Sequence, residues 1–158
     1  MIQSLTNSGP SLTLEMLSRD RNGMELTLPP AYANWLLKHN GGEPSPNTVQ
    51  VKVWGENRVI EVHHFLSFEP AGDAGLGDTL QRWRHHMIGE MEVPPNLLVI
   101  AKDSDGGHAF FLLDTSDERG PISLWYIYSG GYEEDSHANK IHPIFDSFSD
   151  FIDAIGGA

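Results

Sequence analysis

Apolar and polar residues alternate in short stretches of the chain, which is the pattern of half-buried strands. The alternation predicts a strand over residues 11–17 and a second, shorter strand over 24–28. It also predicts strands over residues 49–53 and 59–65. Because the turn-forming residues 55–57 separate the last two, we expect them to pair as an antiparallel hairpin.

Three more strands are predicted downstream. Residues 97–101 form a short, wholly apolar run that is typical of a central strand, and 109–113 and 122–128 follow it as return strands. Loops are predicted where Gly, Pro, Asp and other polar residues gather, at residues 43–47, 71–77, 103–107, 114–120 and 129–140.

A spacing of three and four residues between apolar positions predicts three helices. The first begins at Pro30 and ends at Asn40-Gly41-Gly42, the second is capped by Asp78, and the third has Ser147 and Asp150 placed as a capping box. Their apolar faces comprise Tyr32, Trp35, Leu36 and His39; Leu80, Trp83 and Met87; and Phe148, Phe151, Ile152 and Ile155. Grouped strands with helices before and after them predict one α+β domain over residues 1–158, with a mixed or mainly antiparallel sheet flanked by helices.

Length and charge narrow the possible functions. The 158 residues fit one domain, and a hydrophobic share of 39% is enough for a core. Acidic residues outnumber basic ones by 22 to 10, giving a net charge of −12 that disfavours DNA and anionic membranes and favours a basic partner. Cysteine is absent, which excludes disulfides and thiol catalysis. Neither a secretory signal nor a long apolar segment occurs, so a cytoplasmic protein is expected.

Candidate catalytic and metal-binding residues have simpler structural explanations. His63-His64 and His85-His86 are adjacent pairs, whose side chains point in different directions and do not readily share a metal ion. Asp103-Ser104-Asp105 resembles the start of a calcium loop, but His108 stands where that loop needs glycine, so a hairpin turn is favoured. We expect no metal, no cofactor and no catalysis. A hydrolase that uses Asp103, Asp105 and His108 is left as an alternative.

Acidic residues are concentrated in the C-terminal third. From Lys102 onward, 11 acidic residues stand against three basic ones. Tyr132 directly precedes Glu133-Glu134-Asp135, which puts an aromatic side chain suited to an interface beside an acidic patch. The candidate partner-binding residues are therefore Asp117, Glu118, Tyr132, Glu133, Glu134 and Asp135. The alternative is a solvated acidic surface that only aids solubility.

The segment around the first predicted helix resembles a known family. Leu28-Pro29, Tyr32, Trp35-Leu36 and Asn40-Gly41-Gly42 follow one another at the spacing of the SUKH superfamily, which contains the fungal Smi/Knr cell-wall regulator and many bacterial toxin-immunity proteins. Later positions agree in order: an Asp-x-x-Gly turn at Asp103 and Gly106, a tryptophan strand at Trp125, and a closing helix from Ser147. The resemblance extends from about residue 24 to 155. The chain departs from the pattern at Gly107, where the family often has Asn, and at Tyr126-Ile127, where it often has Asp-His.

The resemblance implies a scaffold whose exposed loops bind another protein. It implies a bacterial immunity protein that occludes the active site of a cognate toxin domain, often a nuclease or another enzyme directed at nucleic acid. Direct binding of nucleic acid or membrane is not expected, and the oligomeric state stays open. A regulatory interaction module without a toxin partner, as the fungal relatives suggest, is the second interpretation.

Overall fold

A five-stranded antiparallel sheet with strand order β5-β6-β7-β8-β9 is the centre of the fold. The computed structural model describes residues 1–69, 79–91, 93–103, 109–126 and 141–157. The strands of the central sheet are β5 (His64–Phe65), β6 (Leu97–Lys102), β7 (Ala109–Asp114), β8 (Ile122–Tyr126) and β9 (Ile141–Phe145). Each neighbouring pair is antiparallel, which confirms the predicted α+β class and sheet type.

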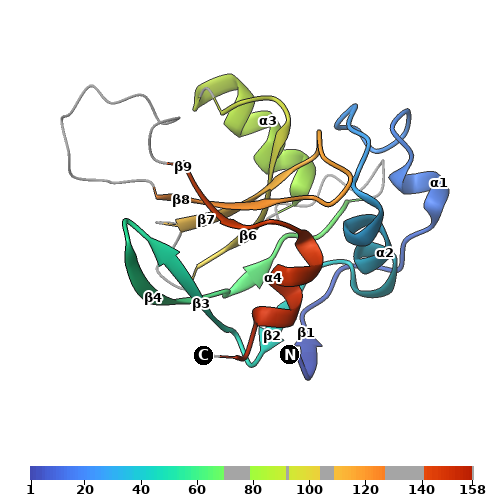
Figure 1. Ribbon diagram of the computed structural model, residues 1–158. Helices are drawn as coiled ribbons and strands as arrows, with labels where there is room; N and C mark the ends of the chain where they lie inside the picture. The colour runs from blue at the N-terminus through green and yellow to red at the C-terminus, as the bar shows by residue number, and fades with distance from the viewer. Residues whose placement is uncertain (70–78, 92, 104–108, 127–140, 158) are drawn as a thin grey trace.

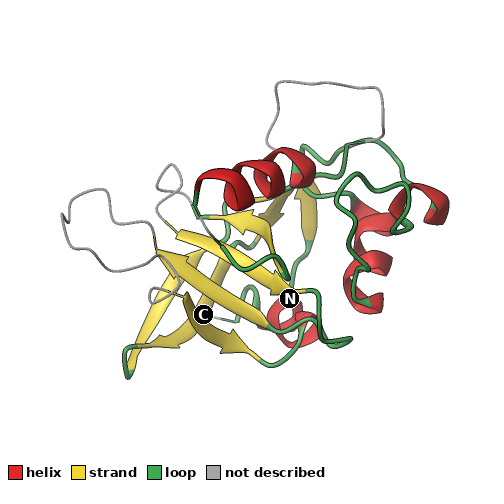
Figure 2. Cartoon of the chain, turned by 90° about the horizontal axis from the view of Figure 1, so that it is seen from above, coloured by secondary structure: helices red, strands yellow, loops and turns green. Residues whose placement is uncertain are grey.

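Helices cover both faces of the central sheet, as Figures 1 and 2 show. On one face, Trp83 of α3 (Leu80–Glu90) packs against Phe110 with 4.9 Å between ring centroids. On the other, Phe151 of α4 (Phe148–Ala154) stacks on Phe111 at 5.2 Å. Neighbouring residues of a strand point to opposite faces, so these two contacts of β7 place α3 and α4 on opposite sides of the sheet.

α2 (Pro30–His39) lies beside α4 and confirms the first predicted helix. Tyr32 and Trp35 contact Phe148 of α4 at 5.0 and 6.0 Å between ring centroids. The helix begins at Pro30, where a missing N–H costs nothing. It ends at Asn40, which adopts the left-handed conformation with φ 44°. Asn tolerates that conformation better than most residues do.

The hydroxyl of Tyr32 is buried with no hydrogen-bond partner among the described residues, and burial raises the pKa of this group well above its ordinary value. A desolvated hydroxyl without a partner costs about 1–3 kcal/mol. We therefore expect Tyr32→Phe to keep the free energy of unfolding unchanged or to raise it by about 1 kcal/mol, as measured by urea denaturation. Tyr32→Leu, which also removes the ring contacts, should destabilise the protein. A loss of stability in Tyr32→Phe would mean that the hydroxyl has a partner.

Two smaller antiparallel sheets complete the fold. β3 (Thr48–Val53) and β4 (Glu56–Glu61) form the predicted antiparallel hairpin, but its turn is at Trp54-Gly55 and not at residues 55–57. The predicted strand over residues 59–65 is divided between β4 and β5, because β5 pairs with β6 in the central sheet. β1 (Ser4–Thr6) pairs with β2 (Glu43–Ser45), so the prediction of a loop over residues 43–47 is wrong. The local composition of β2 is unfavourable to a strand, and its pairing depends on a partner about forty residues away in sequence.

Two predicted strands near the N-terminus are absent. Residues 11–17 instead contain α1 (Leu14–Leu17), and its N-cap Thr13 accepts a hydrogen bond from the Met16 N–H. The alternation was too short to distinguish one helical turn from a strand. Residues 24–28 form no strand because the buried side chain of Asn22 binds this backbone directly, accepting from the Met24 N–H and donating to the Leu26 carbonyl.

Other element boundaries are also corrected. Thr79 caps α3 in place of Asp78, which lies outside the described residues. Ser147 caps α4, but the Asp150 carboxylate accepts from the Ser147 hydroxyl and not from its backbone, so the capping box is only half formed. β9 was not predicted, because Pro143 interrupts its pattern; proline is tolerated here since β9 is an edge strand. None of the described helices is long and apolar enough to cross a membrane.

Candidate functional site

The Asn-Gly-Gly motif at the end of α2 joins three segments of the chain. Asn40 is 2% exposed, and its side-chain oxygen accepts from the Phe68 N–H at 2.7 Å. Its amide donates to the carbonyls of Pro10 and Phe68 at 2.7 and 3.2 Å. The side-chain amide of Asn40 therefore connects the N-terminal segment and the segment after β5 to the end of α2.

The two glycines permit a close approach of backbones at the same place. Gly41 has φ +78°, and a Cβ there would lie 2.7 Å from the Phe65 carbonyl oxygen, which is backbone and cannot move aside cheaply. Gly42 exchanges both backbone hydrogen bonds with Phe65, at 3.0 and 2.8 Å. Hydrogen bonding or close packing thus explains each residue of the Asn-Gly-Gly motif, and none of the three presents a reactive group.

Most of the other residues of the sequence pattern, outside Asn-Gly-Gly, are buried. Buried side chains are found at Leu28, Pro29, Tyr32, Trp35, Leu36 and Trp125. Asp103 follows β6, its N–H donates to the Ala109 carbonyl, and its Oδ1 is buried without a hydrogen-bond partner among the described residues. Gly106, Asp105 and His108 lie outside the described residues, so Asp103 is the one member of the alternative hydrolase cluster that can be located.

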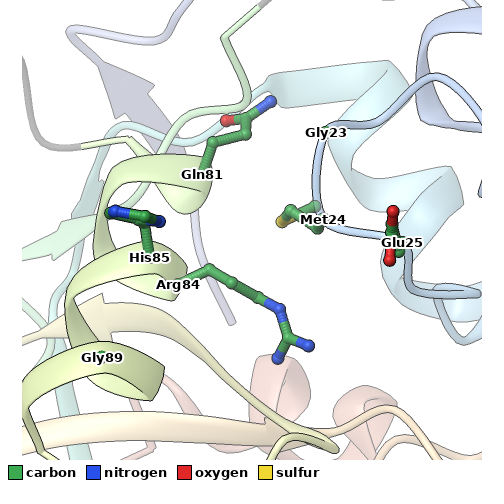
Figure 3. A pocket seen from close by; sticks show the side chains of 7 residues that line it. All are labelled: Gly23, Met24, Glu25, Gln81, Arg84, His85 and Gly89. Atoms are coloured by element: carbon green, nitrogen blue, oxygen red, sulfur yellow. The ribbon is translucent and has the colours of Figure 1, made fainter.

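A pocket of about 360 Å³ lies between α3 and the loop after α1 (Figure 3). Arg84 and His85 line it from α3, and Glu25 lines it from the loop. Burial lowers the pKa of Arg84, whose guanidinium donates to the Pro95 carbonyl. Gln81, also in the lining, is already bound to the backbone of Glu69. The described lining residues include one carboxylate and no serine or threonine, so they provide neither a carboxylate pair nor an activated nucleophile.

A second pocket, of about 550 Å³, separates β1 from α2 and α4. Its walls are mostly apolar, with Ile2, Leu5, Trp35 and Ile152 among the lining residues. Across the whole described part of the chain, no three His, Asp or Glu side chains lie close enough together to hold a metal ion. Neither pocket therefore provides an evident catalytic arrangement.

An acidic face is formed where the turn after β7 meets the start of α4. We define it by Asp117, Glu118, Asp146 and Asp150. The Phe148 N–H donates to the Arg119 carbonyl at 3.0 Å, which fixes the turn against α4. Glu118, Asp146 and Asp150 are exposed. The turn contains one cation, Arg119, which balances one of the four carboxylates. The other three give the face its negative charge.

Hydrogen bonds order the turn that carries this face. Asp117 Oδ1 accepts from the Arg119 backbone N–H at 2.9 Å, and Oδ2 accepts from the guanidinium at 2.9 Å. These bonds with Arg119 lower the pKa of Asp117, so it is ionised at neutral pH but its charge is largely compensated. Burial alone would raise the pKa of Asp114, but hydrogen bonds from Ser116 and Asn96 outweigh it and lower the pKa.

The predicted partner-binding residues are thus only partly located. Asp117 and Glu118 lie on the acidic face, whereas Tyr132, Glu133, Glu134 and Asp135 lie outside the described residues. Of the two located residues, Glu118 has no ion-pair or hydrogen-bond partner within the described ranges and is the better candidate for contact.

Sequence reasoning missed an exposed aromatic group at the tip of the β3–β4 hairpin. Trp54 is 49% exposed and stacks on Tyr126 at 5.3 Å between ring centroids. Its ring also contacts His142 edge-on at 5.0 Å, and the Arg58 guanidinium lies 4.8 Å from its centroid. The available signal was a tryptophan directly before glycine in a hairpin turn, where Asn or Asp is the usual residue.

Comparison with known proteins identifies one family. The model of the SMI1/KNR4 family (SUKH-1) matches residues 12–154, which is most of the chain. No curated protein matches the chain in sequence.

Proposed function

The chain belongs to the SMI1/KNR4 family (SUKH-1), and on that basis we propose that it is an immunity protein that neutralises a cognate toxin domain by covering its active site. The family supports a protein-interaction or immunity-type role in general. The toxin partner, the occlusion of its active site and the absence of catalysis are our proposal.

The observation that carries this proposal is the family match over residues 12–154, because it extends over the central sheet and α2, α3 and α4. The arrangement of the site agrees with it. Motif residues such as Asn40 and Gly41 are used to hold segments together, and charged side chains are left on the surface. A stable scaffold with a charged exterior is what inhibition by binding requires, since it needs no turnover.

The acidic face gives this proposal a physical mechanism. A toxin that acts on nucleic acid needs a cationic groove for the phosphate backbone. A protein with a net charge of −12 is attracted to such a groove at long range, which speeds the encounter. Once bound, its bulk excludes the substrate from the groove.

Co-expression in bacteria tests the proposal. The chain is expressed together with each candidate toxin domain encoded by a neighbouring gene, and survival of the cells is counted. Survival that depends on a stoichiometric complex, isolated by gel filtration, would support immunity. If the chain binds no toxin domain but co-purifies with a regulatory protein, the immunity proposal is wrong and the chain is a regulatory module.

Charge reversal tests the acidic face directly. We expect Glu118→Lys combined with Asp146→Lys to slow association with the toxin domain about 10-fold at low salt and to flatten the salt dependence of the association rate. Stopped-flow mixing at several salt concentrations measures both.

The matched control is Glu15→Lys combined with Asp20→Lys, which makes the same change in net charge around α1. Equal slowing by the two variants would assign the effect to net charge alone. An unchanged rate in the first variant would remove the acidic face from the interface. Reversal of Glu133, Glu134 and Asp135 applies the same measurement to the acidic patch predicted from sequence.

A further inference from the structure

Trp54 occupies a backbone conformation that suits it poorly. Its φ is +54° and that of Gly55 is +79°, and positive φ at both central residues is typical of the type I′ turn of a two-residue hairpin. The first position of this turn favours Asn, Asp or Gly, because a larger side chain in the left-handed region costs about 1–2 kcal/mol. The hairpin therefore retains a residue that the turn itself disfavours.

The surroundings of the ring hold it in one place. Tyr126 of β8 is nearly parallel to it, with 26° between the ring planes, and His142 of β9 meets it at 76°. Arg58 of β4 lies over the ring and pairs with Glu56 at 3.3 Å, so its charge is compensated within the hairpin. An indole fixed by neighbours from three strands loses little rotational freedom on binding, which favours affinity.

The ring nevertheless stays half exposed to solvent. Large hydrophobic side chains are exposed at four positions of the described chain, and two of them, Trp54 (49%) and Val59 (62%), belong to this hairpin. Tryptophan is the residue type most enriched among those that dominate binding energy at protein interfaces. Positive φ and half exposure are unusual for a residue that serves folding alone, and together they favour a role of Trp54 in binding.

We propose that Trp54 is the anchor by which the chain binds its toxin domain, with the indole inserted into an apolar pocket that cationic side chains surround. This inference rests on the proposed function and deepens it. The net charge of −12 attracts the chain as a whole to a cationic surface, whereas the charged residues of the hairpin itself, Lys52, Glu56, Arg58 and Glu61, sum to zero and so suit an apolar contact within that surface. A second copy of the chain is disfavoured, since both copies carry the same charge.

The test is Trp54→Asn, because asparagine is a favoured residue for this turn. The variant should fold, with a urea midpoint equal to or above that of the wild type, while losing the ring. We expect its affinity for the purified toxin domain, measured by isothermal titration calorimetry, to fall at least about 30-fold. Trp54→Phe, which keeps an aromatic ring, should lose less than about 10-fold. Leu14→Asn, at another exposed apolar position, should bind within about twofold of the wild type.

The outcomes separate the inference from the proposed function. If the wild type binds the toxin domain and Trp54→Asn binds equally well, the anchor is overturned and the immunity role stands. If the wild type does not bind, both are overturned. A change in sedimentation of Trp54→Asn without the toxin would identify a second copy as the occupant, which also overturns the proposal.

Discussion

Replacing Asn40 by alanine is expected to lower the free energy of unfolding by about 3–5 kcal/mol. The side chain is 2% exposed and makes three hydrogen bonds to backbone groups of Pro10 and Phe68. Its removal leaves the N–H and carbonyl of Phe68 buried without this partner, and each such group costs about 1–3 kcal/mol, while the part-buried Pro10 carbonyl also loses its hydrogen bond. Total stability of a domain is typically about 5–15 kcal/mol, so much of it would be lost. Urea denaturation followed by circular dichroism measures the effect.

Asn40→Gly provides the matched control. Glycine adopts the left-handed conformation freely, so this variant loses the hydrogen bonds without the added backbone cost that alanine pays. It should be about 1 kcal/mol more stable than Asn40→Ala and still well below the wild type. If both variants stay within about 1 kcal/mol of the wild type, the amide is not the connection that we describe.

The effect of Asn40 on function is expected to be indirect. The motif lies at the end of α2 and joins the N-terminal segment to the region after β5. The two surfaces proposed for binding lie elsewhere, on the β3–β4 hairpin and where the turn after β7 meets α4. This separation agrees with a scaffold that is fixed by its motif and bears its partner-binding residues outside it.

Elements with strong local signals could be predicted from the sequence. α2 has a proline at its start, an apolar stripe and an Asn-Gly-Gly end, and the structure matches each of them. β3 has clean alternation of buried and exposed residues, and β6 has an uninterrupted apolar run because it lies inside the sheet with both faces covered. In these cases the local pattern and the tertiary environment favour the same structure.

Elements that depend on distant partners could not be predicted. β2 is a strand only because β1 lies beside it, and β9 contains a proline that an edge position tolerates. Residues 24–28 are fixed by the side chain of Asn22, which is a polar interaction without periodicity. Alternation over a few residues, as in the segment that contains α1, does not distinguish a strand from a helical turn.

Only the acidic character of the candidate site could be predicted from the sequence. Net charge pointed to acidic residues, and two of those chosen, Asp117 and Glu118, lie on the acidic face. The sequence could not show that Asp117 forms an ion pair with Arg119 whereas Glu118 is exposed. Trp54 was missed because its meaning depends on a positive φ and on partners from β8 and β9, which are known only from the structure.

Phe151→Ala is the second change with a large expected effect, a loss of about 3–5 kcal/mol in the free energy of unfolding. Phe151 is fully buried and contacts Phe65, Phe111 and Phe145 at 6.0, 5.2 and 5.5 Å between ring centroids. These three rings belong to β5, β7 and β9, so one side chain of α4 packs against the central strand and both edge strands. Alanine would leave a cavity that these strands cannot close without moving.

Phe151→Leu is the control, because it fills most of the cavity and should cost about 1–2 kcal/mol. Urea denaturation gives the total loss, and amide hydrogen exchange shows where it falls. Exchange in Phe151→Ala should quicken first in β9, an edge strand that loses its packing to α4. Because β9 carries His142 against Trp54, the variant should also bind the toxin domain more weakly than its folded fraction predicts. Normal binding per folded molecule, together with faster exchange in β9, would show that the Trp54 anchor does not depend on support from that strand.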